Sequence, residues 1–377
     1  MADSPVQSNG MDDGRPPEPG MALCLSGGGY RAMLFHVGTL WRLYEAGLLK
    51  DIKRISSVSG GSITAGVLAL KWAKLGFDPS RLQQDFVPEF VAPVRALAST
   101  TIDALSIVAG IVMPGRISDR VREAYEKHLF GSATLQDLPD TPRFVINATN
   151  VQSGALWRFE KPYMRDYRVG EVKRPTVALA QAVAASSAFP PVLSPVEMAL
   201  DPASFTPGSG QDLQREPFTR TVFLSDGGVY DNMGLETAWK RYDTVLVSDA
   251  GGHMQPEAEP HGDWARHSFR ILDLIDNQVR ALRKRQVIEA FKAGTKKGAY
   301  WGIRTDIADY GLGADALPCP HDRTMALAST ATRLKAMDPL LQDRLVNWGY
   351  AVCDAALRRH VVPGLATGRF PYEAAAV

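Results

Sequence analysis

Apolar positions along the chain follow two spacings in turn, first the short runs of strands and then the repeats of helices. Residues 22–25 are an apolar run that ends in glycines, and apolar side chains then recur at helical spacing over residues 33–44. Residues 52–58 make a second predicted strand, which is followed by more glycines and by a helical pattern that reaches Trp72. Two strand–turn–helix units in about fifty residues predict a parallel sheet with helices on its faces.

Three later apolar segments are expected to join the same sheet. They are residues 144–148, 222–224 and 244–247. Loops rich in Gly, Pro and Ser interrupt the pattern without dividing it, and no internal repeat is visible. The sequence therefore predicts an α/β fold, a three-layer sandwich with a central, mostly parallel sheet flanked by helices. One domain is expected over residues 21–365, between a flexible tail at 1–20 and a C-terminal tail at 366–377.

The ends and the apolar segments bear on membrane contact. The first twenty residues lack a basic start followed by an apolar run, so no secretory signal is predicted and a cytoplasmic location is expected. The longest apolar run, residues 104–113, is about half as long as a bilayer crossing requires. We interpret it as a buried helix, with a lid that dips into a membrane as the alternative.

Composition and net charge bear on the partners, disulfides and metal sites that this chain is expected to have. The 377 residues are 45% hydrophobic and 22% charged, which is typical of a globular chain with a large core. Lys and Arg number 42 and Asp and Glu 41, so the net charge of +1 predicts no nucleic-acid partner and leaves membrane contact to a local patch. The three cysteines, Cys24, Cys319 and Cys353, form no CxxC pair. We therefore expect no disulfide framework, metal site or cofactor.

The turn after the second predicted strand contains a candidate nucleophile. Residues 57–62 read Ser-Val-Ser-Gly-Gly-Ser, close to the G-x-S-x-G turn that exposes a serine hydroxyl above a sheet, with Ser57 in place of the first Gly. Ser59 is then the nucleophile, and the Gly60 N–H faces a developing oxyanion at the start of the helix. In the alternative, Ser59 caps the helix, and the rival serines are Ser56, Ser57 and Ser62.

The turn after the first predicted strand offers backbone N–H groups. Residues 27–29 are three glycines at a helix N-terminus, an arrangement that suits an oxyanion and equally a phosphate. A dinucleotide-binding loop would need an acidic residue after the next strand, where this chain has a serine turn, and Ala32 replaces the last Gly of that motif. Arg31 is expected to steady the loop or to bind a substrate phosphate; otherwise it is solvated.

A nucleophilic serine needs a base, and two acids follow predicted strands. Asp226 precedes Gly227 and Gly228, and Asp249 precedes Ala250 and a pair of glycines. Either acid can instead bond the amides of its own turn, so the pattern alone leaves both candidates open.

Four blocks in this order resemble those of the patatin-like phospholipases. They are Gly27–Arg31, Ser57–Gly61, Ala185–Pro191 and Asp226–Gly228. Their order and spacing extend over roughly residues 21–250, and the combination is far more specific than any one block.

The resemblance implies hydrolysis of fatty-acyl esters of membrane phospholipids or lysophospholipids by a Ser-Asp dyad. Ser59 matches the nucleophile and Asp226 the general base, whereas Asp249 matches no block. The oxyanion hole is expected at Gly27, Gly28, Gly29 and Gly60. The expected supporting residues are Arg31, Gly61, Gly227 and Gly228. The alternatives are a triad through His253, His261 or His267, a soluble carboxylesterase, and a non-catalytic nucleotide- or anion-binding protein. His36, inside the first helix, is expected to be a packed residue.

A helical pattern over residues 269–297 combines an apolar face with basic side chains. The apolar face contains Leu272, Ile275, Val279, Leu282 and Gln286, and the second half of the segment contains Arg280, Arg283, Lys284, Arg285, Lys292, Lys296 and Lys297. We interpret it as a surface helix that packs its apolar face on the sheet, with a helix lying on anionic headgroups as the alternative. Membrane contact is accordingly expected to be peripheral and conditional, through residues 104–113 and 280–285.

Patatin-like enzymes of this length also resemble effectors of antiphage defence that a cyclic nucleotide activates. This resemblance implies a cyclic nucleotide activator, with positive side chains from the helix around 280–285, and activation through self-assembly into an oligomer.

Overall fold

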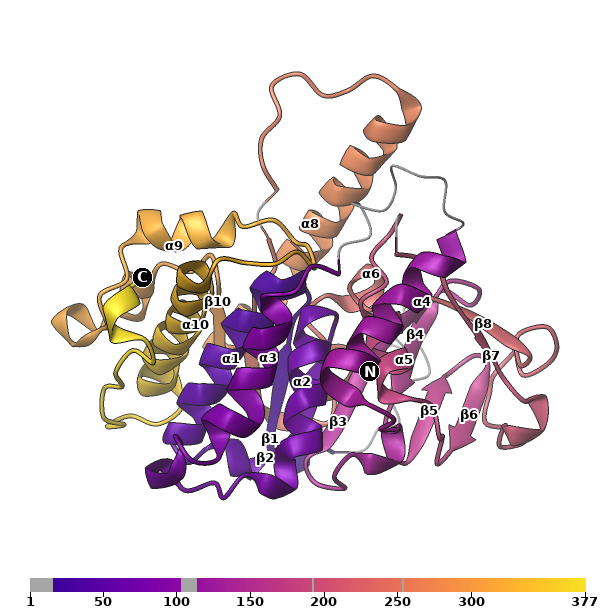
Figure 1. Cartoon of the computed structure of the whole chain (residues 1–377), viewed down its shortest axis with the longest axis horizontal. Helices are drawn as coiled ribbons and strands as arrows, with labels where there is room; N and C mark the ends of the chain where they lie inside the picture. The colour runs from indigo at the N-terminus through magenta and orange to yellow at the C-terminus, as the bar shows by residue number, and fades with distance from the viewer. Residues whose placement is uncertain (1–15, 103–113, 192, 253) are drawn as a thin grey trace, which may run out of the picture.

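Ten strands of the described residues form one mixed sheet (Figure 1). The computed structural model describes residues 16–102, 114–191, 193–252 and 254–377. The strands are β1 (Glu18–Leu25), β2 (Ile52–Ser57), β3 (Arg143–Asn150), β4 (Ala155–Phe159), β5 (Tyr163–Asp166), β6 (Gly170–Lys173), β7 (Val196–Ala199), β8 (Thr221–Asp226), β9 (Tyr242–Asp249) and β10 (Lys297–Gly302). The five segments that the sequence predicts as strands are therefore confirmed as β1, β2, β3, β8 and β9.

The middle of the sheet is parallel and one side is antiparallel. Strands β10, β9, β1, β2 and β3 lie in this order and run parallel, as predicted. Beyond β3 the strands β4, β5 and β6 form an antiparallel meander. Strand β8 runs antiparallel to β3, and β7 pairs with β8.

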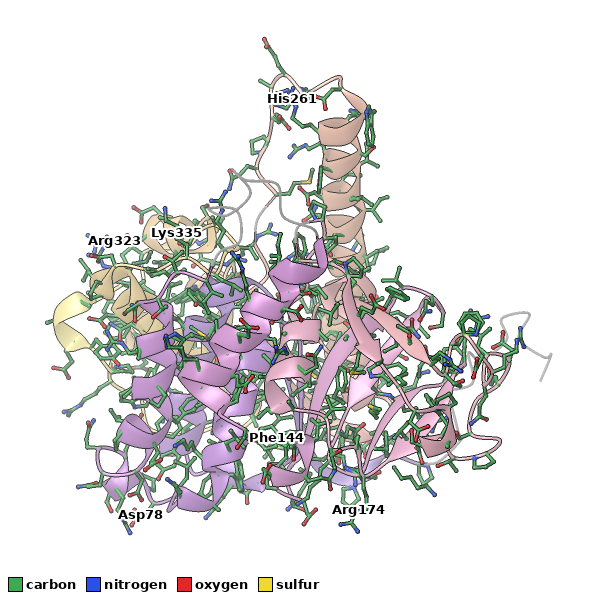
Figure 2. All side chains as sticks on the ribbon, turned by 45° about the vertical axis from the view of Figure 1, so that its right-hand side comes forward. Asp78, Phe144, Arg174, His261, Arg323 and Lys335 are labelled. Atoms are coloured by element: carbon green, nitrogen blue, oxygen red, sulfur yellow. The ribbon has the colours of Figure 1, made fainter. Side chains whose placement is uncertain are left out.

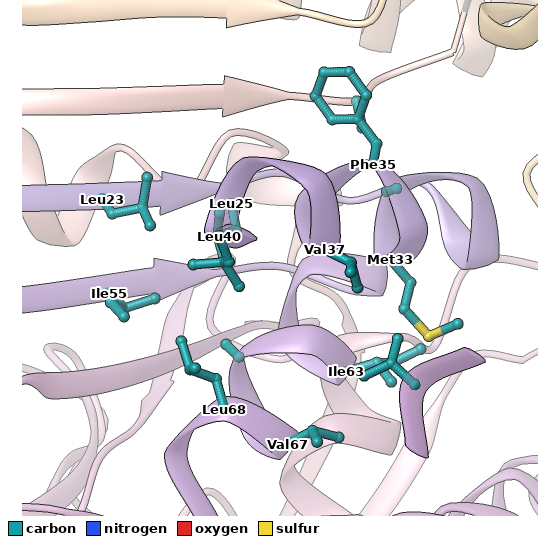
Figure 3. Packing of buried hydrophobic residues seen from close by; sticks show 14 of the residues in the cluster. Leu23, Leu25, Met33, Phe35, Val37, Leu40, Ile55, Ile63, Val67 and Leu68 are labelled. Atoms are coloured by element: carbon teal, nitrogen blue, oxygen red, sulfur yellow. The ribbon is translucent and has the colours of Figure 1, made fainter. Parts of the chain in front are cut away.

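Helices cover both faces of the sheet. They are α1 (Gly29–Glu45), α2 (Gly60–Lys71), α3 (Ala92–Ala98), α4 (Pro114–Tyr125), α5 (Leu179–Ser186), α6 (Gly228–Asp231), α7 (Glu236–Trp239), α8 (Trp264–Lys292), α9 (His321–Ala328) and α10 (Pro339–His360). Alternate residues of β1 point to opposite faces, so Leu23 and Leu25 join the large core under α1 and α2, as Figure 3 shows. Ala22 and Cys24 join a smaller cluster with α7 and Val287 of α8. This three-layer arrangement confirms the predicted fold class.

Helix α1 is fixed in position by close contact with α10. A Cβ at Gly38 would lie 1.9 Å from the Val346 carbonyl oxygen, and one at Gly349 would lie 1.9 Å from the Phe35 carbonyl oxygen. Only glycine allows two helix backbones to approach so closely. Because α1 begins at the glycine turn after β1, this contact also fixes that turn.

Helix α8 begins well outside the body of the protein and ends inside it, as Figure 1 shows. Val287 near its C-terminal end is buried, whereas Leu272, Ile275 and Leu282 are more than half exposed. The prediction that this segment packs its apolar face on the sheet is therefore wrong. The helix also ends at Lys292, and Lys297, which the pattern includes in it, is the first residue of β10.

The structure bears differently on the expected apolar helix, the expected C-terminal tail and membrane crossing. The predicted buried helix at 104–113 lies outside the described residues. Within residues 366–377, the Tyr372 and Ala376 carbonyls accept hydrogen bonds of 2.9 and 2.8 Å from the Asn347 side chain of α10, so this segment packs on the domain. Among the helices that the structure describes, none has the length and apolar composition needed to cross a membrane.

Candidate active site

Ser59 occupies the turn between β2 and α2 in a backbone conformation that residues other than glycine rarely adopt. Its φ is 50° and its ψ is −119°. A bulky residue in this region is strained, and such strain is typical of turns that hold a serine hydroxyl above a sheet. The Ser59 side chain makes no capping hydrogen bond to α2, so the alternative that it merely caps the helix is wrong.

Ser186, at the end of α5, holds this turn in place. Its hydroxyl oxygen accepts a 2.9 Å hydrogen bond from the Ser59 N–H, and the hydroxyl donates to the Asn147 carbonyl over 2.7 Å. Ser62 lies 2.9 Å from the same hydroxyl. The strained conformation of Ser59 is thus fixed by a residue that lies far from it in the sequence.

The rival serines have structural partners. The Ser56 hydroxyl donates to the Gly234 carbonyl over 2.6 Å, and the Ser57 hydroxyl donates to the Val145 carbonyl over 3.1 Å. Ser62 donates to the Ser57 oxygen over 3.0 Å. All three side chains are buried, whereas Ser59 lines a cavity.

Asp226 reaches Ser59 because β2 and β8 lie end to end along the same edge of β3. Strand β2 ends with Ser57 opposite Ile146, and β8 arrives from the other direction and ends with Asp226 opposite Ala148. The carboxyl group accepts a 2.7 Å hydrogen bond from the Gly228 N–H, and the neighbouring Ser59 hydroxyl stabilises its ionised form and so acts to lower its pKa. The structure therefore brings these two predicted residues together.

Burial dominates the electrostatics of Asp226. The residue is 2% exposed, and loss of hydration raises the pKa of its carboxyl to about 7, although the hydrogen bonds from Gly228 and Ser59 act in the opposite direction. The negative charge of Asp276 on α8 contributes a smaller rise. A carboxyl with a pKa near neutrality can both accept and return a proton, as a general base must.

The other candidate bases lie elsewhere. Asp249 accepts a 2.8 Å hydrogen bond from the Gly251 N–H and a 2.7 Å hydrogen bond from the Tyr300 hydroxyl, so it stabilises its own turn. His261 and His267 are exposed and do not line the cavity that contains Ser59. Figure 2 shows His261 at the outer end of the projecting segment, and His253 lies outside the described residues.

The glycine turn after β1 supplies the N–H groups expected at an oxyanion hole. Gly28 and Gly29 have φ values of 141° and 58°, which only glycine adopts without strain. The Gly27 N–H, an expected oxyanion donor, instead donates to the Asn232 carbonyl over 3.0 Å. Among the hydrogen bonds of the described residues, none uses the N–H of Gly28, Gly29 or Gly60 as donor.

The supporting glycines let backbone segments touch around the turn. A Cβ at Gly60 would lie 2.2 Å from the Gly29 carbonyl oxygen, and one at Gly61 would lie 2.5 Å from the Leu25 carbonyl oxygen. A Cβ at Gly227 would lie 2.3 Å from the Asn147 carbonyl oxygen. Side chains at these positions would push apart the segments that carry the nucleophile, the base and the N–H donors.

Arg31 ties the glycine turn to two distant loops. Its side chain is buried and donates to the Ala250 carbonyl over 3.1 and 3.3 Å and also to the Thr330 carbonyl. Burial, with a contribution from Arg280, lowers the pKa of the guanidinium to about 10. The expectation of a solvated arginine is thus wrong. Arg31 also lines the cavity, so its two other expected roles, steadying the loop and binding a substrate phosphate, stay predictions.

His36 lies beneath the same turn as a packed residue, as predicted. Its ring nitrogens lie 2.9 Å from the Ser248 hydroxyl and 2.9 Å from the Ser26 carbonyl oxygen. Complete burial lowers the pKa of the imidazole to about 4, so the ring is neutral at physiological pH.

A cavity of about 760 Å³ opens above Ser59 and Asp226. Its apolar lining includes Phe189, Pro190, Pro191, Leu193, Met254, Phe269 and Leu334, and its charged lining includes Arg31, Arg270, Asp273, Asp276, Arg280 and Arg333. A volume of this size accommodates an extended organic ligand. Among the described residues, no group of three His, Cys, Asp or Glu side chains is arranged to hold a metal ion.

Comparison with known families identifies the group to which this site belongs. The model of the family described as patatin-like phospholipase matches residues 23–239, which is more than half of the chain. The chain belongs to the patatin-like phospholipase family. The matched residues contain all four blocks that suggested the family, and that prediction is confirmed. Members of the family are lipid acyl hydrolases.

Three solved structures illustrate what the chain is similar to. Human group IVD cytosolic phospholipase A2 is 15% identical, over 65% of this chain and 49% of that chain, with a TM-score of 0.40. VipD from Legionella pneumophila is 16% identical, over 92% of this chain and 67% of that chain, with a TM-score of 0.35. The type III effector protein ExoU is 14% identical, over 92% of this chain and 54% of that chain, with a TM-score of 0.32.

This patatin-like chain therefore spans about half of the length of the human phospholipase that it matches. No curated protein sequence matches the chain.

The predictions from sequence missed several residues that build the site. The side-chain oxygen of Asn232 would lie 2.5 Å from a Cβ at Gly27 and 2.6 Å from one at Gly228, so it fills the space between the two glycine turns. Asp276 reaches the cavity from α8. No local motif marks these positions, because each acts through contacts between segments that are distant in the sequence.

Proposed function

We propose that this patatin-like protein hydrolyses fatty-acyl esters of phospholipids or lysophospholipids, with Ser59 as the nucleophile and Asp226 as the general base. The observation that carries the proposal is that the Ser59 hydroxyl, held at a φ of 50°, shares a cavity with the neighbouring buried Asp226 carboxyl, whose pKa is about 7. A strained turn and a buried carboxyl both cost stability, and both suit acyl transfer.

In the first half of the reaction the Ser59 oxygen attacks the ester carbonyl carbon and its proton passes to Asp226. The tetrahedral oxyanion then accepts hydrogen bonds from the N–H groups of Gly28, Gly29 and Gly60. One such donor is worth roughly 3–4 kcal/mol of transition-state stabilisation. Collapse of the intermediate breaks the bond to the glycerol oxygen, and Asp226 returns the proton to that leaving oxygen.

In the second half a water molecule attacks the acyl-enzyme ester. Asp226 accepts a proton from the water, the same N–H groups hold the second oxyanion, and the proton returns to the Ser59 oxygen as the fatty acid leaves. Each proton that Asp226 accepts is released within the same half-reaction, so the enzyme ends in its starting state.

The lining of the cavity supports a lipid substrate. Phe189 is 51% exposed and Phe269 is 39% exposed, and both line the cavity, so an acyl chain finds apolar walls at its mouth. Arg333 adds positive charge at the same cavity, which suits a phosphodiester headgroup. We infer that contact with the bilayer is peripheral and occurs around this mouth.

A fluorophosphonate probe and vesicle substrates test the proposal. The wild-type chain should be labelled, and Ser59→Ala should lose both labelling and fatty-acid release, while Ser80→Ala, an exposed serine, should retain both. Labelling that persists in Ser59→Ala would refute the assignment of the nucleophile. An absence of labelling would favour an anion-binding protein, and equal rates on vesicles and soluble esters would favour a carboxylesterase.

Activation by a cyclic nucleotide, an antiphage role and a cytoplasmic location stay predictions. The side chains expected to attract the activator have partners, since Arg280 lies 3.0 Å from Asp276 and Arg283 lies 3.6 Å from Asp231. Ester hydrolysis measured with and without cyclic di- and trinucleotides tests the activation, and an unchanged rate would dismiss it.

A further inference from the structure

Helix α8 has its charged face toward the protein and its apolar face toward solvent. Ile271, Leu272, Leu274, Ile275, Val279 and Leu282, here called the α8 stripe, are 40% to 58% exposed. Trp264, one to two turns before the stripe, is 83% exposed. At 1.5 Å per residue, the apolar surface from Trp264 to Leu282 is about 27 Å long.

The opposite face of α8 carries charges that are already paired. Arg280 lies 3.0 Å from Asp276, and Arg283 lies 3.6 Å from Asp231 at the end of α6. Lys284 lies over the ring of Tyr300 at 4.9 Å from its centroid. A surface helix of a soluble protein normally shows the reverse polarity, so the α8 stripe is a surface that another apolar surface is expected to cover.

The position of the cavity disfavours a lipid bilayer as the cover. The α8 residues that line the cavity are Phe269, Arg270, Asp273, Asp276 and Arg280, which lie on the face opposite the stripe. A helix is about 10–12 Å thick, so a bilayer on the stripe would be separated from the cavity by the helix itself. At the outer end of α8, Arg266 lies 2.6 Å from Asp263 and Arg270 lies 3.4 Å from Glu257, which leaves little free positive charge for anionic headgroups.

We propose that the α8 stripe binds the α8 stripe of a second copy of this chain, in an antiparallel helix pair about a twofold axis near Ile275. Such a pair places Ile271 of one copy against Val279 of the other and Ile275 against its own counterpart, so the surface is complementary to itself. Straight ridges of aliphatic side chains at helical spacing pack into one another in this way.

The size of the surface suits a dimer. Stable interfaces bury about 800 Å² on each partner, with an apolar centre and a polar rim. The α8 stripe and Trp264 supply such a centre, and Gln278 and Gln286, both exposed, border it. Because the stripe faces away from the cavity, dimerisation leaves the mouth of the site open. The proposal does not depend on the catalytic roles of Ser59 and Asp226.

Sedimentation velocity on the full chain tests the proposal directly. We expect a dimer at micromolar concentration, and Ile275→Glu should weaken it by at least about 30-fold, since it places two negative charges at the centre of the interface. The control is Leu340→Glu at the start of α10. Leu340 is 45% exposed, close to the exposure of Ile275, and its substitution should leave the dimer intact. A monomeric wild-type chain, or a dimer that survives Ile275→Glu, would overturn the proposal.

A cysteine cross-link checks the symmetry without relying on a disruptive variant. Cys24, Cys319 and Cys353 are buried, so Ile275→Cys adds an accessible thiol. Mild oxidation should join two copies through this position and should not join copies of Leu340→Cys. Cosedimentation with vesicles of phosphatidylcholine and phosphatidylglycerol completes the test. If the chain is a monomer and Ile275→Glu abolishes vesicle binding, a lipid surface covers the stripe and the dimer is refuted.

Discussion

The Ser59 hydroxyl lies beside the Asp226 carboxyl because the two strands that precede these residues meet end to end along β3. Strand β2 runs parallel to β3 and β8 runs antiparallel to it, so both strands end near Ile146 and Ala148. In a triad of serine, histidine and an acid on a parallel sheet, loops bring the three residues together. Here one edge of one strand positions both the nucleophile and the base.

The rate of hydrolysis should follow the ionisation of Asp226. The carboxyl accepts a proton only when it is ionised, and burial raises its pKa to about 7. We expect kcat/KM to fall about tenfold for each pH unit below 7 and to level off above it. A profile with its midpoint near pH 4, as for an exposed carboxyl, would contradict the role of burial.

Removal of a second negative charge should move this midpoint. Asp276 on α8 raises the pKa of Asp226 through space, so Asp276→Asn should shift the acid limb of the kcat/KM profile to lower pH by a fraction of a unit. Asp119→Asn, an exposed position on α4, is the control and should leave the midpoint unchanged. An unchanged midpoint would show that the through-space interaction is absent.

The same burial should make Asp226 costly for stability at high pH. Its folded pKa of about 7 lies above the ordinary aspartate value of 3.8, so the folded state binds the proton more tightly and the free energy of unfolding falls as pH rises from about 4 to 7. Asp226→Asn cannot ionise. Urea denaturation gives the free energy of unfolding of Asp226→Asn minus that of the wild type. This difference should be larger at pH 8 than at pH 4, by up to about 4 kcal/mol. An equal difference at both pH values would contradict this expectation.

The sequence predicts the parts of the site that rest on local rules. Glycines after an apolar run and a serine between small residues require particular backbone angles, so Gly28, Gly29 and Ser59 can be placed from the pattern. Ser186 and Asn232 cannot, because their roles arise only when α5 and the turn after α6 pack against the nucleophile turn.

Helix α8 shows the same limit for the fold. Its periodicity predicts a helix correctly, but the rule that apolar faces point inward assigns the wrong face to the body. The ion pairs that turn its charged face inward involve Asp231 of α6 and Glu236 of α7, which no periodic pattern can anticipate.

Gly60 should be indispensable for activity. A Cβ at this position would lie 2.2 Å from the Gly29 carbonyl oxygen, so Gly60→Ala must displace the turn that carries the oxyanion donors. Loss of one donor lowers kcat by about 100- to 1,000-fold, and we expect Gly60→Ala to fall in this range or below it. Gly262→Ala is the matched control, since nothing lies within 4 Å of its added Cβ. Similar kcat values for the two variants would contradict the geometry.

Arg31 should act as a positioning residue whose effect on activity passes through the loops that it holds. The planar guanidinium bonds the Ala250 and Thr330 carbonyls at once, and a lysine ammonium at the same place cannot span both. Arg31→Lys should lower the free energy of unfolding by about 2–3 kcal/mol, because a buried charge and a carbonyl lose partners. It should also lower kcat while leaving the pH midpoint near 7, since the environment of Asp226 is retained. Arg120→Lys, an exposed change on α4, should alter neither quantity. If Arg31→Lys instead raised KM for phospholipid vesicles alone, with unfolding unchanged, Arg31 would bind the headgroup and not the loops.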